Sequence, residues 1–449
     1  MDRLTSFDAP VPSPLERREA GRALRKQTPR SAHGNWEPSA DRADPVEILL
    51  EASRTREQTL LPLRWERMSA SPFAFLRGSA LVMAHDLATT PTTGIEVQLC
   101  GDAHLANFGV FASPERRLVF DLNDFDETAP GPFEWDVKRL GASIAVAART
   151  AGIDRVGGRR AVIEAVSSYR DWMERYSAMT HLEVWYQDID TNQLVELMPV
   201  HRRTFEQRLE QASSKNHLKA LDKLTAVVDG RRVIVDDPPI VEHVAGTRLR
   251  ERIETMLTLY RSSLQHDRRS LFDRYRFVDF ARKVVGVGSV GTRCWIVLMQ
   301  GPNGGPMFLQ VKEARQSVIT AALEREPHEH HGRRVVDGQR LLQATSDVLL
   351  GYTRDDNMKI DYYVRQLWDA KGSIDVTRLQ PAGFAVYSAF CGWALARAHA
   401  RTGDSNDISG YLGQSSRFAE SMADFAEAYA DQTERDHAVL VGSLSKLAG

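Results

Sequence analysis

The stretch from residue 96 to 139 restricts the fold most, because it leads two short apolar runs into polar turns. The first run, 95–100, alternates as a strand does and ends at Gly101-Asp102. The second run, 117–122, ends at Asn123-Asp124-Phe125-Asp126. Because a strand end is rigid and the loop after it is exposed, two such ends hold several carboxylates around one point. The stretch predicts a site made of acidic loops.

One spacing in this stretch indicates phosphoryl transfer. Asp102 and Asn107 stand in the order Asp-x-x-x-x-Asn. In phosphotransferases of the kinase type, such an Asp accepts the proton of the acceptor hydroxyl, and the Asn ligates magnesium. A later Asp holds the ion that bridges the phosphates, and the candidates are Asp124, then Asp121, then Asp126. The alternative is a polar loop with capping aspartates, since Asp and Asn are common turn residues.

Residues 100–107, which read CGDAHLAN, resemble the catalytic loop H-G-D-x-H-x-x-N of the aminoglycoside and choline kinases. The resemblance implies that Asp102, His104 and Asn107 are catalytic and that ATP and Mg²⁺ are the cofactors. Cys100 stands where the kinase His stands, so other groups must brace the loop. The segments GDAHLANFG, NDFDET and PFEWDVKR are similar to an uncharacterised bacterial family placed with the kinase-like fold. In the kinases a second Asp follows the magnesium Asp by 12 positions, as Asp136 follows Asp124.

A glycine-rich motif lies late in the chain, at Gly286-x-Gly288-x-x-Gly291. The motif is weak alone, but 292–299 and 307–314 read as strands, where a dinucleotide fold would have a helix. A glycine loop in a hairpin, followed by Lys312 on the next strand, is the kinase arrangement, and it predicts that these residues bind ATP. An ordinary hairpin with a surface lysine is the alternative. The helix expected at 333–347 lacks the Glu that holds the lysine in kinases.

The order of these motifs is unusual, because ordinary kinases place the glycine loop and lysine before the catalytic Asp. Between Gln27 and Val137 the chain has no lysine, so a lysine that grips the nucleotide must come later. We therefore predict an α+β, bilobal, protein-kinase-like fold that is circularly permuted, with added N-terminal and C-terminal helices. The expected parts are a flexible arm at 1–45, a helical large lobe with the catalytic loop and magnesium site at 46–270, a small β-rich nucleotide-binding lobe at 271–370, and helices completing the large lobe at 371–449.

Composition narrows the class of protein. The net charge of −2 argues against a general nucleic-acid binder, and three well-separated cysteines favour a reducing compartment without disulfides. No signal peptide is evident, and no apolar run reaches the ~18 residues of a membrane span. We expect a cytoplasmic protein without membrane or nucleic-acid partners, whose partners are a nucleotide and an unknown hydroxyl-bearing acceptor. The oligomeric state is left open.

Other functions fit parts of the pattern. The missing Glu and the cysteine at position 100 favour a nucleotide-binding regulator without turnover. Transfer of a nucleotidyl group to a protein would use the same nucleotide-binding residues. Asp102-Ala103-His104 is also the Asp-x-His of a metallophosphoesterase, but no further histidine occurs from Leu105 to Thr180. Arg77, among the apolar residues at 73–76, either clamps a phosphate or carboxylate or packs on an aromatic ring with its head in solvent.

Overall fold

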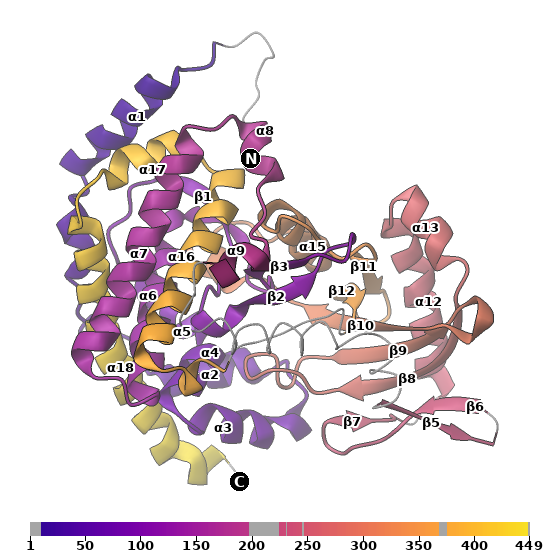
Figure 1. The fold of residues 1–449 in the computed structure, drawn as a ribbon. Coiled ribbons are helices and arrows are strands. Elements are labelled where there is room, and N and C mark those ends of the chain that lie inside the picture. Colours follow the sequence, from indigo (N-terminus) through magenta and orange to yellow (C-terminus); the bar gives the residue numbers. More distant parts are fainter. Residues whose placement is uncertain (1–9, 197–223, 230, 245–246, 368–374, 448–449) are drawn as a thin grey trace.

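The computed structural model describes residues 10–196, 224–229, 231–244, 247–367 and 375–447. It has two parts side by side, a helical body and an antiparallel sheet with helices packed on it (Figure 1). Helices from both ends of the chain build the body, and the middle of the chain builds the sheet. The mixed α+β class expected from the sequence is confirmed.

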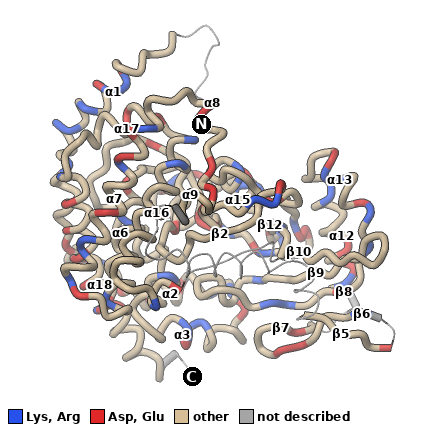
Figure 2. Tube along the Cα trace, viewed as in Figure 1, with Lys and Arg blue, Asp and Glu red and all other residues tan. Residues whose placement is uncertain are grey.

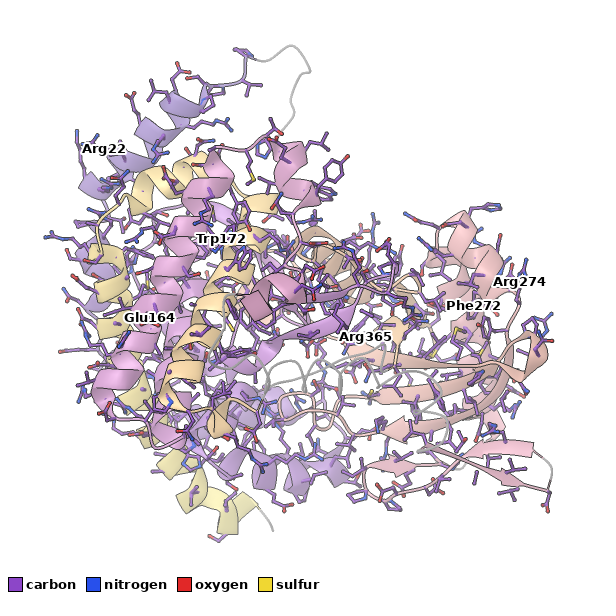
Figure 3. The ribbon with its side chains drawn as sticks, viewed as in Figure 1. Arg22, Glu164, Trp172, Phe272, Arg274 and Arg365 are labelled. Carbon is purple, nitrogen blue, oxygen red and sulfur yellow. The ribbon has the colours of Figure 1, made fainter. Side chains whose placement is uncertain are left out.

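The helical body contains the longest helices of the described chain. Its helices are α1 (Pro14–Ala23), α2 (Pro45–Ser53), α3 (Leu61–Ser69), α4 (Pro72–Gly78), α5 (Ala80–Ala88), α6 (Phe133–Thr150), α7 (Arg155–Ser177), α8 (His181–Tyr186), α9 (Thr191–Glu196), α16 (Pro381–Thr402), α17 (Ser405–Leu412) and α18 (Arg417–Leu447). α16 lies along α7, where the rings of Trp172 and Trp393 stack 3.9 Å apart (Trp172 is labelled in Figure 3).

The sheet has six strands in the order β11-β12-β10-β9-β8-β7. These are β7 (Val241–Glu242), β8 (Arg276–Lys283), β9 (Cys294–Gln300), β10 (Pro306–Ala314), β11 (Gly351–Asp355) and β12 (Ile360–Gln366); the helices between these strands in sequence are α12 (Thr247–Ser263), α13 (His266–Phe272), α14 (Val318–Ala322), which packs on α5, and α15 (His331–Leu342). Tyr260 and Phe272 pack with Trp295 in one apolar cluster, so α12 and α13 cover a face of the sheet. The strands expected at 292–299 and 307–314 are confirmed, which places Lys312 on the central strand β10.

The stretch 181–270, which was expected to belong to the helical large lobe, contains strands as well as helices among its described residues. Beside helices it contains the hairpin β5 (Thr225–Val228) with β6 (Arg231–Ile234), and strand β7. The β-branched residues at 225–234 favour a strand, and an Asp-Gly pair between two such runs is a hairpin signal. The expectation for residues 197–223 concerns a segment outside the described residues.

Two short antiparallel strand pairs position the acidic loops. β1 (Glu96–Leu99) pairs with β4 (Ala129–Pro132), and β2 (Phe108–Ala112) pairs with β3 (Leu118–Leu122). The loop after β1 therefore returns directly into β2, and the loop after β3 returns into β4, beside β1. This connection brings together the two polar turns that the sequence places 20 residues apart.

The first 45 residues were expected to form a flexible arm, but residues 10–45 fold onto the body. α1 packs on α17. Arg25 and Arg30 donate to the carbonyls of Tyr411 and Leu412 at the C-terminal end of α17, where the helix dipole favours cations. These two arginines therefore anchor the N-terminal segment to the body. Residues 1–9 lie outside the described part.

His33 gives this anchoring a pH dependence. The ring is buried, with Nε2 2.7 Å from the hydroxyl of Tyr411, and burial lowers the pKa of His33 to about 3. The unfolded chain therefore binds the extra proton below about pH 6.5, and the folded chain does not, so this contribution to stability is lost as the pH falls. Between pH 7.5 and 5, the wild type is expected to lose about 2 kcal/mol more unfolding free energy than His33→Gln. Denaturant titrations at both pH values measure it; equal losses would contradict it.

Charges of both signs are interspersed over the two parts (Figure 2). Cys100, Cys294 and Cys391 are buried as free thiols. Within the described residues, no helix combines the length and the apolar composition that crossing a membrane requires.

Candidate functional site

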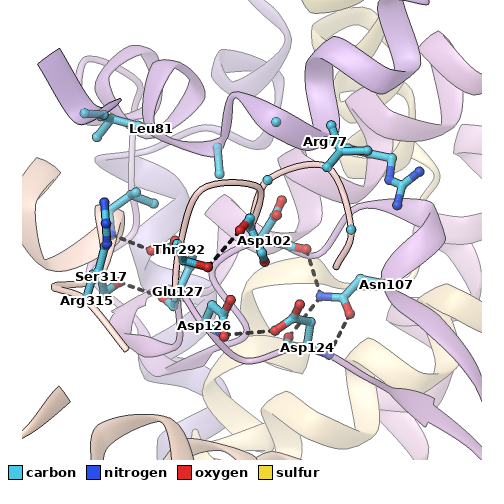
Figure 4. A pocket seen from close by; sticks show the side chains of 18 of the residues that line it. Arg77, Leu81, Asp102, Asn107, Asp124, Asp126, Glu127, Thr292, Arg315 and Ser317 are labelled. Atoms are coloured by element: carbon cyan, nitrogen blue, oxygen red, sulfur yellow. Dashed lines mark hydrogen bonds between the residues drawn. The ribbon is translucent and has the colours of Figure 1, made fainter. Parts of the chain in front are cut away.

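A pocket of about 1010 Å³ opens where the helical body meets the sheet (Figure 4). Its walls come from the loops after β1 and β3, from the loop 284–293 between β8 and β9, and from helices α2, α4 and α5. The loop after β1 and the glycine loop, which are about 180 residues apart in sequence, thus line one cavity.

The loop after β1 is braced from below by Asp136 in the first turn of α6. Its carboxylate accepts from the amides of Cys100, at 2.7 Å, and Gly101, at 3.0 Å. His399 of α16 places Nε2 3.3 Å from the same carboxylate, and the hydroxyl of Tyr169 lies 2.9 Å from its Nδ1. The brace that the cysteine at position 100 requires is therefore built from α6, α7 and α16.

Asp102 lines the pocket with one carboxylate oxygen engaged. Oδ1 accepts from Nε of Arg139 at 2.8 Å, and Oδ2 lies 3.7 Å from Nε2 of His104. Burial lowers the pKa of His104 to about 4, so its ring is neutral at pH 7. A neutral imidazole both donates and accepts, so His104 can orient a hydroxyl beside Oδ2 without adding charge.

Asn107 ties the two acidic loops together. Its Nδ2 donates to the carbonyls of Asp102 and Asp124 at 3.0 Å, and its Oδ1 accepts from the amide of Asp124 at 2.7 Å. Asn107 is buried, so these bonds fix the distance between the loops. Its Oδ1 keeps one lone pair for a further ligand.

Lys312 reaches this acidic loop from the sheet. Its ammonium contacts Asp126 and lies 3.5 Å from Asp124, while the lysine is only 2% exposed. Burial opposes ionisation of Lys312, but the two carboxylates hold the pKa of Lys312 above its usual value. Lys312 and Arg365 lower the pKa of Asp124, whereas burial and the neighbouring Asp124 raise that of Asp126. A late lysine and the early acids thus meet at one point.

Local backbone geometry explains why glycine occupies each of the three positions of the loop. Gly286 and Gly291 adopt φ of 64° and 84°, a conformation that other residues rarely accept. A Cβ on Gly288 would lie 3.1 Å from the carbonyl oxygen of Arg77, so this position permits close approach of α4. Gly286 and Gly288 line the pocket, and Gly291 lies beside Arg56.

Arginines of the helical body hold the glycine loop by its carbonyls. Arg64 donates to Val287 and Gly288 and also to Gly78. Arg67 donates to Gly286. The loop is therefore docked on α3, and no spacing in the sequence predicts this contact.

Replacing Arg64 tests this docking. Arg64→Met leaves three carbonyls without their donor, while it also removes a buried cation whose pKa burial lowers. We expect a net loss of about 1–3 kcal/mol of unfolding free energy, and faster hydrogen exchange at 286–291. Arg67→Met, which removes one bond from a partly exposed arginine on the same helix, should cost less than about 1 kcal/mol. Equal exchange in both variants would contradict the docking role.

Asp121, the second candidate for the magnesium ligand, lies outside the pocket lining. It is buried in β3, where Nη2 of Arg397 lies 2.7 and 2.8 Å from its two oxygens, and Ala344 donates its amide to it. Strand alternation turns this side chain into the body, so Asp121 forms a structural ion pair with Arg397. Asp124 and Asp126 remain as candidates.

These two carboxylates and Asn107 form a set of hard oxygen donors. Asp126 presents Oδ1 buried and without a hydrogen-bond partner among the described residues. Those residues contain no group of three or more His, Cys, Asp or Glu side chains that could hold a metal by themselves. Mg²⁺ does not need one, because it is commonly bound by one or two carboxylates together with substrate phosphates and water. The donor set therefore fits Mg²⁺ bound with a phosphate ligand.

Sequence reasoning missed Arg139 and His399. Arg139 follows Asp136 by three positions, so both lie on one face of α6, and this spacing was a usable signal. His399 had none, because it comes from a helix 263 residues away from its partner.

Comparison with known proteins gives one finding. A family profile described as "Uncharacterized protein conserved in bacteria (DUF2252)" matches residues 56–443. Neither the curated proteins nor the solved structures gave a match.

Proposed function

We propose a function for this chain, which belongs to that bacterial family, from its own pocket: an ATP- and magnesium-dependent phosphotransferase that acts on a hydroxyl of a small molecule or protein. One observation carries the proposal. Lys312 of the sheet contacts Asp126 and lies 3.5 Å from Asp124, and these two carboxylates line the cavity together with Asp102, Asn107 and the glycine loop. Phosphoryl transfer needs a cation for the phosphates, donors for magnesium and a base for the acceptor, and these groups supply all three.

Each residue has a stated task in this proposal. Asp102 accepts the proton of the acceptor hydroxyl through Oδ2, because Arg139 already occupies Oδ1. Asp124 and Asp126, with Oδ1 of Asn107, would hold magnesium, which when bound neutralises the charge of the phosphates. The ammonium of Lys312 binds phosphate oxygens. His104 orients the acceptor hydroxyl.

The connection of the sheet supports a kinase-like fold. The glycine loop joins β8 to β9, Lys312 lies on the next strand β10, and α15 with β11 and β12 follows. The proposed catalytic loop comes earlier in the chain. The helix α16 lies near the end of the chain, and the hydroxyl of its Tyr387 donates to the carbonyls of Leu105 and Phe108. A late helix that supports an early catalytic loop is what circular permutation of such a fold requires.

A regulator that binds nucleotide without turnover is the second candidate. The observation that favours it is the contact of Lys312 with the carboxylates expected to hold magnesium, in place of a Glu on α15. Calorimetry with Mg²⁺ and ATP, together with a product assay on a panel of hydroxyl acceptors, separates the two. ATP binding with ADP and a phosphorylated product supports the phosphotransferase, and binding without product supports the regulator. A mass increase by a nucleotide would instead indicate nucleotidyl transfer, and no binding would remove the proposal.

A further inference from the structure

Arg77 is a cation in the pocket without a described partner. It lies in the last turn of α4, with its Cζ 6.0 Å from the ring centroid of Phe73, and it is partly buried. Its Nε is buried without a hydrogen-bond partner, and among the described residues the guanidinium makes neither a hydrogen bond nor an ion pair. Figure 4 shows the guanidinium extending toward the side of the pocket where Asn107 lies.

The other arginines that line the pocket are committed to the protein. Their partners are Val290 for Arg56, the carbonyls at 78, 287 and 288 for Arg64, Glu313 and Thr55 for Arg315, and Gln310 and Asn123 for Arg365. A guanidinium has five donors, and leaving them unpaired in a partly buried place is costly. Arg77 is therefore held ready for a partner that the chain does not provide.

The position of Arg77 assigns that partner to the acceptor. In the proposed function the pocket has a phosphate end at Asp126, whose carboxylate Lys312 contacts, and a proton-accepting end at Asp102 and His104. Arg77 belongs to the second end, because Arg139, the ion-pair partner of Asp102, also donates to the carbonyl of Leu76, the residue directly before Arg77. Asp102 already has Arg139 as its ion-pair partner, so Arg77 is not required to balance it.

We propose that Arg77 binds an anionic group, a carboxylate or a phosphate, of a small acceptor whose hydroxyl is presented to Asp102. The planar guanidinium matches both groups with two parallel hydrogen bonds. This inference rests on the proposed function and narrows its substrate class to hydroxyl-bearing anions, such as hydroxy acids or phosphorylated alcohols.

Binding of simple anions tests the site without turnover. Calorimetry with inorganic phosphate and with malonate compares the wild type, Arg77→Ala and Arg77→Lys. Arg77→Ala is expected to weaken binding of at least one anion tenfold or more, with partial recovery in Arg77→Lys, and the anion that is affected identifies the group. The matched control is Arg175→Ala, an arginine in the last turn of α7 that lies over Trp172 outside the pocket. An equal affinity for both anions in the wild type and Arg77→Ala overturns the inference.

Turnover supplies the second arm. Glycerol, glycerate and glycerol 3-phosphate are related acceptors that differ in their charged group. The anionic members are expected to be the better substrates, and Arg77→Ala should raise their KM tenfold or more while the KM for ATP and the rate with glycerol change less than twofold. A preference for glycerol, or an unchanged KM ratio, overturns the inference. If the wild type binds no ATP but Arg77 still binds an anion, the proposed function fails and the anion site stands; the reverse result leaves the phosphotransferase and removes the anion site.

Discussion

Asp102→Asn is expected to lower ATP-dependent product formation by a factor of about 10²–10⁴, the usual contribution of a positioned general base. The amide has the same shape and can still accept from Arg139, whose Nε lies 2.8 Å from Oδ1. The amide cannot take up a proton at the position of Oδ2, the oxygen of Asp102 that faces His104. The affinity for Mg²⁺ and ATP should change less than threefold, because Asp102 is not among the proposed phosphate and metal ligands. Initial rates and calorimetry on the same preparations measure the two effects.

A suitable control is Asp404→Asn. Asp404 is 18% exposed and lies 2.8 Å from Arg17, while Asp102 is 21% exposed and paired with Arg139, so both substitutions remove a partly buried carboxylate from an arginine pair. Asp404 caps α17, a task that Asn also performs. The control should keep its activity. Equal turnover in Asp102→Asn and the wild type would remove the general-base assignment, and a loss of ATP affinity would show that Asp102 acts on the nucleotide.

The parts of the site that sequence could predict are those fixed by local geometry. Asp102 and Asn107 are joined by one turn, and the loop with Asp124 follows after one hairpin, so their spacing already determined that they meet. The strand with Lys312 was readable from its β-branched neighbours and the glycines before it. That this lysine contacts Asp126 was a hypothesis about tertiary structure, since 186 residues separate the two.

The parts that sequence could not predict depend on distant partners. Nothing in the spacing around Asp121 distinguishes a magnesium ligand from a buried ion pair, because the answer lies in Arg397, 276 residues later. The same holds for the carbonyls of the glycine loop, whose donor Arg64 precedes them by more than 220 residues. An arginine that pairs with carbonyls has no acidic partner for sequence patterns to reveal.

Lys312→Met is expected to abolish the binding of the nucleotide phosphates by this residue and to raise the affinity of the site for Mg²⁺. Turnover should fall by a factor of about 10² or more, because Lys312 is the lysine that pairs with Asp124 and Asp126 among the described residues and electrostatic stabilisation is a large part of this chemistry. Asp124 and Asp126 lose the cation that now neutralises them, so their affinity for Mg²⁺ alone should rise. The metal-free protein should lose about 1–3 kcal/mol of unfolding free energy, less than for a fully buried pair, because the Asp124 side chain is 44% exposed.

The opposite signs make this prediction specific. Mg²⁺ should restore the thermal stability of Lys312→Met to a larger extent than it stabilises the wild type, because it replaces the missing charge between the same two carboxylates. Lys138→Met is the matched control, since Lys138 of α6 is also fully buried and lies 5.3 Å from the ring centroid of Phe425 in α18, whereas the lysine paired with Asp124 and Asp126 is Lys312. It should leave turnover and Mg²⁺ affinity unchanged. If Lys312→Met binds Mg²⁺ more weakly than the wild type, Asp124 and Asp126 are not metal ligands, and the contact of Lys312 with them is a structural ion pair.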